Sequence, residues 1–458
     1  MQIGFDDSAS PGSNGLDSAA ISEELPPMSD GSKRNPLLAI FTTVFIDLLG
    51  FGILLPVFPL LINPGSPYKV MPGSPQHGLI LLGWLQAIFP FCIFIAAPVL
   101  GQLSDRFGRR PVLAFSIAGT SISYVLFAIG IINKNLPLLF FARAFDGLTG
   151  GNIAVAQAAI GDISTNENRA KNFGVLGAAF GLGFVIGPYL GGRLSAPNTS
   201  FYGLFHTPSW FSASTPFWFA SVLAALNCML ILFKLPETLK TKDPNRKVEL
   251  GRSFHNVAEG FASPRLRIPL LATFLFNSGF TFFTTFAGVF LARQFGFTQS
   301  KTGDFFALVG IFIALSQGLL VGKVAKKLPD FKVLRFAFFG NALAIFTYVW
   351  AKSTLPLYLT VPIFTAFNGL CMANLTSLVS RSAEMGKQGQ AMGIYSSVQS
   401  FAQVIPAALV GYITAGIGSR TPLVVSSVVM GLAGLAFVTL FRPTYVASAQ
   451  PGSPAMAH

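Results

Sequence analysis

The stretch "GQLSDRFGRRPV", residues 101–112, stands between two long apolar runs and decides how the rest of the chain is interpreted. It concentrates four charges, at Asp105, Arg106, Arg109 and Arg110, in a chain of which only 11% of residues are charged. Because typical domains carry about 25% charged residues, this composition predicts a polytopic membrane protein. The stretch is then a short loop at the water interface, and its charges either orient the protein or also act in its mechanism.

The apolar runs are long enough to cross a bilayer as helices. A bilayer core of about 30 Å needs about 20 apolar residues in a helix, and glycines and prolines inside such runs are tolerated. A β-barrel would instead show short alternating segments. We expect twelve spans, near residues 37–62, 79–103, 112–132, 136–160, 171–194, 215–233, 268–293, 302–325, 332–351, 355–379, 388–413 and 421–441.

The basic residues predict the orientation of these spans. Of the 31 Lys and Arg residues, 23 lie in the segments on one side, seven on the other, and Arg143 lies inside a span. Basic residues favour the cytoplasm, so both termini are expected to be cytoplasmic. The net charge of +13 does not indicate nucleic-acid binding, because the basic residues fall between apolar runs and form no patch on a soluble face.

The chain also repeats itself. "AFDGLTGGN" at 144–152 matches "AFNGLCMAN" at 366–374, and "APVLGQLSDRF" at 97–107 lies over "GLLVGKVAKKL" at 318–328. The near-constant offset predicts an all-α fold of two pseudo-symmetric six-helix bundles with a pathway between them. We expect a disordered tail over 1–36, an N-terminal bundle over 37–233, a cytoplasmic linker over 234–267, a C-terminal bundle over 268–441 and a disordered tail over 442–458.

The stretch at residues 101–112 resembles the signature of the loop between the second and third spans in the major facilitator superfamily. "IDLLGFGILLPVFPLL" (46–61), "ARAFDGLTGGNIAVAQAAIGDIS" (142–164) and "GLGFVIGPYLGGRL" (181–194) are similar to motifs of its drug:proton antiporters. Within the superfamily the likeness is closest to the tetracycline-resistance efflux group. The resemblance implies twelve transmembrane helices, a small-molecule substrate and alternating access. The spans near 112–132 and 332–351 contain no acidic residue where that group has aspartates, which puts tetracycline itself in doubt.

Three ionisable residues lie at membrane depth: Asp47, Arg143 and Asp146. A charge at the bilayer centre costs about 2.5–3.5 kcal/mol, so such residues normally face the bundle interior and pair. One interpretation is a static salt bridge between helices. The other is a proton site, in which Asp47 and Asp146 carry the proton and Arg143 modulates them, because burial disfavours the charged carboxylate and a nearby arginine favours it.

The charged loop predicts more than orientation. Gly101 and Gly108 allow close approach or unusual backbone angles, and Asp162 is a candidate partner for Arg109. The resemblance implies that the loop latches the two halves in the outward-facing state. The matched loop, "GKVAKKL", has no Asp, so the latch is expected to be asymmetric. The predicted latch comprises Gly101, Asp105, Arg106, Gly108, Arg109, Arg110 and Asp162.

The span near 171–194 is rich in glycine, at Gly183, Gly187, Gly191 and Gly192, with Pro188 among them. These residues let helices pack closely and bend, and packing alone would explain them. The resemblance implies instead an antiporter motif that discourages leak.

Polar side chains inside the spans are candidates for a substrate cavity. Several recur at helical spacing, and Asn368 stands where the other half has an aspartate. Ordinary hydrogen bonds between helices explain each of them equally well. The candidates are Gln86, Gln157, Asn277, Thr281, Asn368, Gln399 and Gln403.

The absence of nucleotide-binding and cofactor motifs argues against ATP-driven transport by this chain. No Walker motif or cofactor motif is present, and the cysteines and histidines show no metal-ligand spacing. We expect a monomeric transporter, not an enzyme, in the plasma (bacterial inner) membrane, without cofactor or metal and driven by a proton gradient. Its partners are protons, a hydrophobic drug-like compound and the lipid bilayer. The alternatives are a proton-coupled symporter for a sugar or other nutrient, and a non-transporting membrane sensor.

Overall fold

The computed structural model describes residues 36–164, 169–201, 205–239, 241–244, 248–384 and 387–442, without the side chains of 169–171, 173, 201 and 205. The described residues lie in one compact unit, Asn35–His458. The predicted tails, apart from Pro36 and Arg442, lie outside the described residues.

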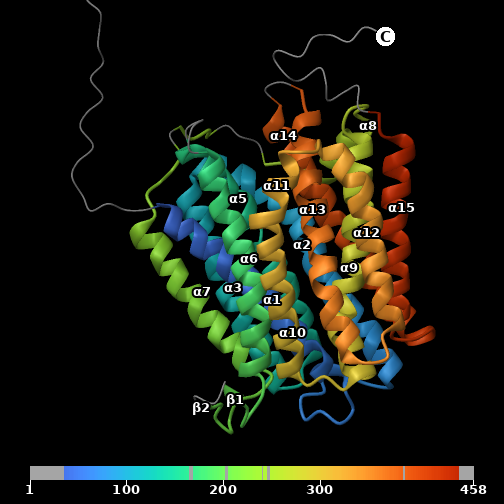
Figure 1. The fold of residues 1–458 in the computed structure, drawn as a ribbon. Helices are drawn as coiled ribbons and strands as arrows, with labels where there is room; N and C mark the ends of the chain where they lie inside the picture. Colours follow the sequence, from blue (N-terminus) through green and yellow to red (C-terminus); the bar gives the residue numbers. More distant parts are fainter. Residues whose placement is uncertain are drawn as a thin grey trace, which may run out of the picture. The chain divides into compact units, whose positions relative to one another are not determined.

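Long helices occupy all the predicted spans, so the predicted all-α membrane fold is confirmed (Figure 1). Eleven helical segments are long and apolar enough to cross a membrane, and the broken span α4–α5 completes the twelve. The first half contains α1 (Pro36–Ile62), α2 (Pro75–Phe107), α3 (Arg109–Ile132), α4 (Leu136–Thr149), α5 (Asn152–Ile163), α6 (Arg169–Leu194), the short strands β1 (Ser200–Phe201) and β2 (Phe205–His206), and α7 (Thr215–Lys234). The second contains α9 (Arg267–Phe295), α10 (Gln299–Leu315), the π-helix η1 (Ser316–Val321), α11 (Gly322–Ala325), α12 (Asp330–Trp350), α13 (Thr354–Ser382), α14 (Gln388–Gly416) and α15 (Thr421–Leu440).

The span predicted near 136–160 is present, but it is not one continuous helix, because the chain breaks at Gly150 and Gly151 between α4 and α5. A Cβ on Gly151 would lie 2.9 Å from the Cα of Ala97 on α2, so the absence of a side chain allows the two backbones to touch here. The freed carbonyl of Thr149 accepts a hydrogen bond from Ser116 of α3, as broken helices inside membranes require.

The segment predicted as a linker contains an amphipathic helix, α8 (Arg252–Ala262), which spans no membrane. It buries Ser253, Asn256 and Gly260 on one face. Ser253 donates to the carbonyl of Phe94 on α2, and Asn256 donates to Ser397 on α14 at 3.2 Å. The linker helix therefore holds a helix of each half.

Packing across the two halves runs mainly through α2 with α14 and α6 with α10. The end of the bundle that carries residues 101–112 and α8 is here called the latch end. The opposite end, which carries β1, β2 and the loop 63–74, is the hairpin end (Figure 1). Successive spans run alternately between these two ends.

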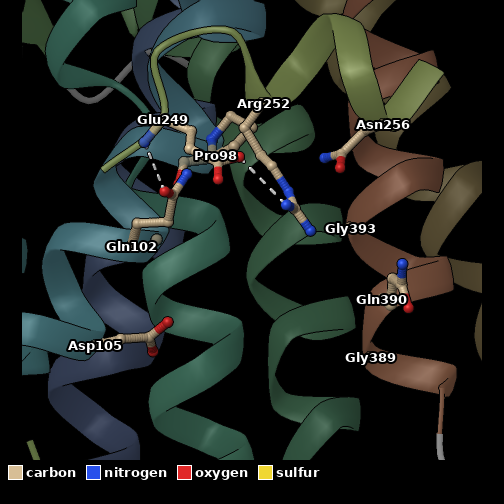
Figure 2. Close-up of a pocket in the computed structure, with 10 residues that line it drawn as sticks. Pro98, Gln102, Asp105, Glu249, Arg252, Asn256, Gly389, Gln390 and Gly393 are labelled. Atoms are coloured by element: carbon tan, nitrogen blue, oxygen red, sulfur yellow. Dashed lines mark hydrogen bonds and ion pairs between the residues drawn. The ribbon is translucent and has the colours of Figure 1, made fainter. Parts of the chain in front are cut away.

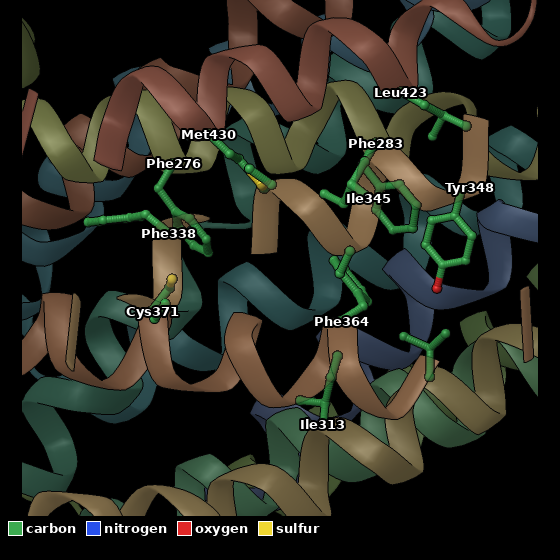
Figure 3. Close-up of a cluster of buried hydrophobic side chains, with 14 of the residues drawn as sticks. Phe276, Phe283, Ile313, Phe338, Ile345, Tyr348, Phe364, Cys371, Leu423 and Met430 are labelled. Atoms are coloured by element: carbon green, nitrogen blue, oxygen red, sulfur yellow. The ribbon is translucent and has the colours of Figure 1, made fainter. Parts of the chain in front are cut away.

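The second half has a core rich in aromatic rings (Figure 3). Phe276 of α9 lies 6.0 Å, centroid to centroid, from Phe338 of α12, and Phe283 lies 4.9 Å from Phe364 of α13. All four rings are buried. Many of the 47 phenylalanines therefore serve packing between helices, which offset or tilted rings favour.

The halves touch at the hairpin end and stand apart at the latch end. A Cβ on Gly83 of α2 would lie 2.9 Å from the Ala407 carbonyl oxygen of α14, and one on Gly303 of α10 would lie 2.5 Å from the Pro188 carbonyl oxygen of α6. Nothing lies within 4 Å of such a Cβ on Gly101, Gly174, Gly177, Gly318, Gly322, Gly389 or Gly393, all toward the latch end. The same helix pairs are thus in backbone contact at one end and separated at the other.

Candidate functional site

The three predicted membrane charges lie in the first half, on α1 and α4. Arg143 and Asp146 are both buried, and the Arg143 Nη1 lies 3.3 Å from the Asp146 Oδ2. The guanidinium of Arg143 also stacks over the ring of Phe89 on α2, 4.0 Å from its centroid, a cation–π contact that suits a desolvated arginine. The buried cation is therefore held by a carboxylate and an aromatic face.

Asp47 connects α1 to the break in the fourth span. Asn152, the first residue of α5, donates from Nδ2 to the Asp47 Oδ1 at 2.8 Å. Asp146 stands four residues before the break and Asn152 directly after it. Both carboxylates thus lie beside a helix interruption, the kind of backbone feature found at ion and substrate sites of membrane transporters.

The charged loop forms a compact network around Arg109, which is buried. The Arg109 Nη1 lies 2.7 Å from the Asp105 Oδ1 and donates to Ser104 at 2.6 Å. Its Nε donates to the Asp162 Oδ2 at 2.9 Å, which is the predicted pairing. Arg109 therefore ties together α2, α3 and α5 within the first half.

Glu237 belongs to this network and was missed by the sequence reasoning. Its carboxylate accepts from the backbone N–H groups of Arg109, at 2.9 Å, and Arg110, at 3.3 Å, at the start of α3. Gly108 has φ +111°, and a Cβ there would collide with the Glu237 carboxylate. The signal available in the sequence was an acid just beyond the sixth span, among basic residues, with nothing to indicate contact over 128 positions.

The second half contains a charge-reversed counterpart. The Arg381 Nη1, at the end of α13, lies 3.4 Å from the Oδ2 of Asp330 at the start of α12, and Ser377 donates to the same oxygen at 2.7 Å. Arg109 at the start of α3 and Asp162 at the end of α5 occupy the corresponding places. The expected asymmetry is thus present at Asp105, while the neighbouring ion pair recurs with its charges exchanged.

The cavity at the latch end has a volume of about 670 Å³ and lies between α2, α14 and the linker (Figure 2). Asp105 lines it beside Gly101, whereas Arg106 is exposed and stacks against Phe107 at 5.3 Å. The lining residues are Pro98, Gly101, Gln102, Asp105, Glu249, Arg252, Asn256, Gly389, Gln390 and Gly393. The predicted latch therefore faces α14 across open space in this structure.

The glycines of α6 face two neighbouring helices. A Cβ on Gly183, Gly187 or Gly191 would lie within 2.6–2.7 Å of α1 atoms, those of Leu48, Leu49 and Ile53. Gly192 faces the other way, and a Cβ there would lie 2.5 Å from the Gln299 carbonyl oxygen of α10. Pro188 contacts both neighbours: its Cδ would lie 2.6 Å from a Cβ on Gly52 of α1, and its carbonyl oxygen 2.5 Å from one on Gly303 of α10.

The predicted substrate residues are dispersed. Gln86 donates to the Thr285 carbonyl of α9 at 2.9 Å, across the two halves. Asn277, Thr281 and Gln403 bond to carbonyls of their own helices, Gln399 donates to Tyr395, and Gln157 is half-buried on α5. Asn368 is fully buried, and both its side-chain polar atoms lack a hydrogen-bond partner among the described residues. Neither the latch-end cavity nor a second one of about 460 Å³ at the hairpin end is lined by these residues, so their substrate role stays a prediction.

Twelve spans in two repeated halves, with ionisable groups inside one half and an opening at one end, define an integral membrane transporter. Residues 40–407 match the Major Facilitator Superfamily, and the chain belongs to that family.

Two relatives are similar to this chain in sequence, and one solved structure is similar to it in fold. It is 30% identical over 374 residues to the tetracycline resistance protein, class C, of Escherichia coli, covering 81% of this chain and 87% of that protein. It is 28% identical over 395 residues to multidrug resistance protein 2 of Bacillus subtilis (strain 168), covering 84% and 90%. The crystal structure of the human organic anion transporter MFSD10 (TETRAN) superposes with a TM-score of 0.67 at 22% identity, covering 89% of this chain and 100% of that one.

Proposed function

We propose that this chain is a proton-coupled antiporter that exports a hydrophobic, aromatic compound by alternating access. The observation that carries the proposal is the placement of Asp47, Arg143 and Asp146 inside the membrane spans, beside the break between α4 and α5. Carboxylates at that depth are costly to keep, and proton relays are their common use in transporters. The relatives named for tetracycline and multidrug resistance support export of a drug-like compound.

In this proposal both termini are cytoplasmic, so the latch end faces the cytoplasm of the plasma (bacterial inner) membrane. The opening between α2 and α14 is then the cytoplasmic entrance. The bundles 37–233 and 268–441 move against each other as a monomer, and the proton gradient supplies the energy without cofactor or metal. Proton and substrate favour opposite states of this equilibrium, which couples the two fluxes.

The test is substrate accumulation in proteoliposomes with an imposed pH gradient, for wild type, Asp47→Asn and Asp146→Asn. We expect the variant that lacks the true carrier to lose uphill transport while keeping downhill exchange, because the cavity remains. Glu384→Gln is a matched control, since it removes an exposed carboxylate outside the spans. Uphill transport at the wild-type rate in both aspartate variants would show that neither carries the proton.

A further inference from the structure

An ion pair joins the two halves at the hairpin end, outside the predicted latch and the membrane charges. The Nη2 of Arg193, in the last turn of α6, lies 2.9 Å and 2.8 Å from the two carboxylate oxygens of Asp304 on α10. The Nη1 of Arg193 donates to the carbonyl of Ser200 at 3.0 Å, and its guanidinium lies 5.5 Å from the Tyr189 ring centroid. The arginine is thus held from both sides of the interface.

The pair flanks a close approach of the two halves, between α6 and α10. Gly192 precedes Arg193 and Gly303 precedes Asp304, and a Cβ on either glycine would lie 3.1 Å from the other glycine's Cα. A small separation of α6 and α10 would therefore break the pair at once. The Arg193 side chain is 13% exposed and the Asp304 side chain 37% exposed, so the pair is partly shielded from solvent.

We infer that Arg193 and Asp304 form the gate of the hairpin end, an ion pair made in the state that is open at the latch end and broken when the hairpin end opens. The inference rests on the proposed function only in taking the two states to be steps of transport. The pair exists across halves only while α6 and α10 are in contact, so it lowers the free energy of one state and not of the other. Arg109, by contrast, is bonded within the first half and does not hold the two halves together in this structure.

Arg193 is one of the few basic residues on the less basic side of the predicted topology. Its pairing with Asp304 gives a physical reason for an arginine at this place. A partly exposed pair is worth at most about 1 kcal/mol, which is about a fivefold change in the ratio of two states. The gate is therefore weak enough to open in each cycle and strong enough to shift the resting population.

The test measures the distance between two spin labels at the hairpin end, in protein without its native cysteines. Ser209→Cys, before α7, and Ser353→Cys, before α13, place the labels at exposed positions on opposite halves. We expect Arg193→Gln and Asp304→Asn each to raise the population with a separated hairpin end by up to about fivefold. The exchanged pair, Arg193→Asp with Asp304→Arg, should return the population toward wild type.

Arg293→Gln is the matched control. Arg293 lies in the last turn of α9, also at the hairpin end, and makes no ion pair with any residue that the structure describes. It should leave the distances unchanged. Unchanged distances in both single variants would overturn the gate.

If the single variants fold poorly, a disulfide cross-link between the same two positions tests the gate instead. Arg193→Cys with Asp304→Cys, once oxidised, should stop transport, and reduction should restore it. Transport that continues with the disulfide intact would also overturn the gate. Because label distances need neither substrate nor gradient, failure of the export assay in wild type would count against the proposed function and not against the gate.

Discussion

The residue that most constrains the first half is Arg143, because it carries a full charge into an apolar interior. Among the residues that the structure describes, its ionic partner is Asp146, and Phe89 covers it from α2. The spacing of Arg143 and Asp146 on one helix face was enough to predict that they pair. The contacts of Phe89 and Asn152 were not predictable, because they depend on how α1, α2 and α5 approach one another.

A double variant separates a static salt bridge from a proton site. Arg143→Leu leaves Asp146 buried without its cation, and breaking a buried pair in this way costs about 3–5 kcal/mol, so folded protein should fall sharply. Arg143→Leu with Asp146→Asn removes both charges and should recover folded protein, measured by size-exclusion chromatography and thermal melting. We expect this double variant to remain inactive in uphill transport. Uphill transport by the folded double variant would show that Arg143 and Asp146 have only a structural role.

At the scale of elements, the apolar runs predicted every span to within a few residues, because hydrophobic length is what a bilayer selects. The break at Gly150 and Gly151 was not predictable, since glycines are tolerated in continuous membrane helices. The helix in the linker was missed for a different reason. It has 11 residues, too few to cross a bilayer, so a search for long apolar runs passes over it.

The latch loop gives a prediction at this scale. Asp105 lines the latch-end cavity and faces α14 across it, although its present ionic partner is Arg109. If the loop closes on α14 in the other state, Asp105 is placed to meet the α14 N-terminus, where a carboxylate is favoured. We expect Asp105→Asn to reduce transport about tenfold through loss of about 1.4 kcal/mol from the closed state, with normal abundance.

The comparison for this prediction is Glu249→Gln, which removes a more exposed carboxylate from the same cavity. It should transport like wild type. Normal transport by Asp105→Asn would mean that the charge of Asp105 has no part in closing the latch end and that the loop charges serve only to orient the protein in the membrane.

At the scale of the whole molecule, the sequence predicted two related halves but could not predict which end is open. The two states of such a transporter differ by a few kcal/mol, which is small beside the energies that fix each half. The state is visible in the glycine contacts, which are tight at Gly83 and Gly303 and absent at Gly101 and Gly389, and in the cavity at the latch end. The sequence does not distinguish these glycines, yet some lie at a contact between the halves and others border the open end.

This difference gives a prediction about bulk at the open end. A leucine at Gly389 meets nothing within 4 Å of its Cβ in this structure, so Gly389→Leu should fold and insert normally. If α2 and α14 must touch at the latch end for the other state to form, as they touch at Gly83 in this one, the added side chain should hold the latch end open. We expect substrate binding from the latch end to survive and turnover to fall by at least about tenfold. Gly431→Leu on α15, which also has open space around its Cβ, controls for the added hydrophobic side chain. Equal turnover in the two variants would mean that α2 and α14 do not close at Gly389 during the cycle.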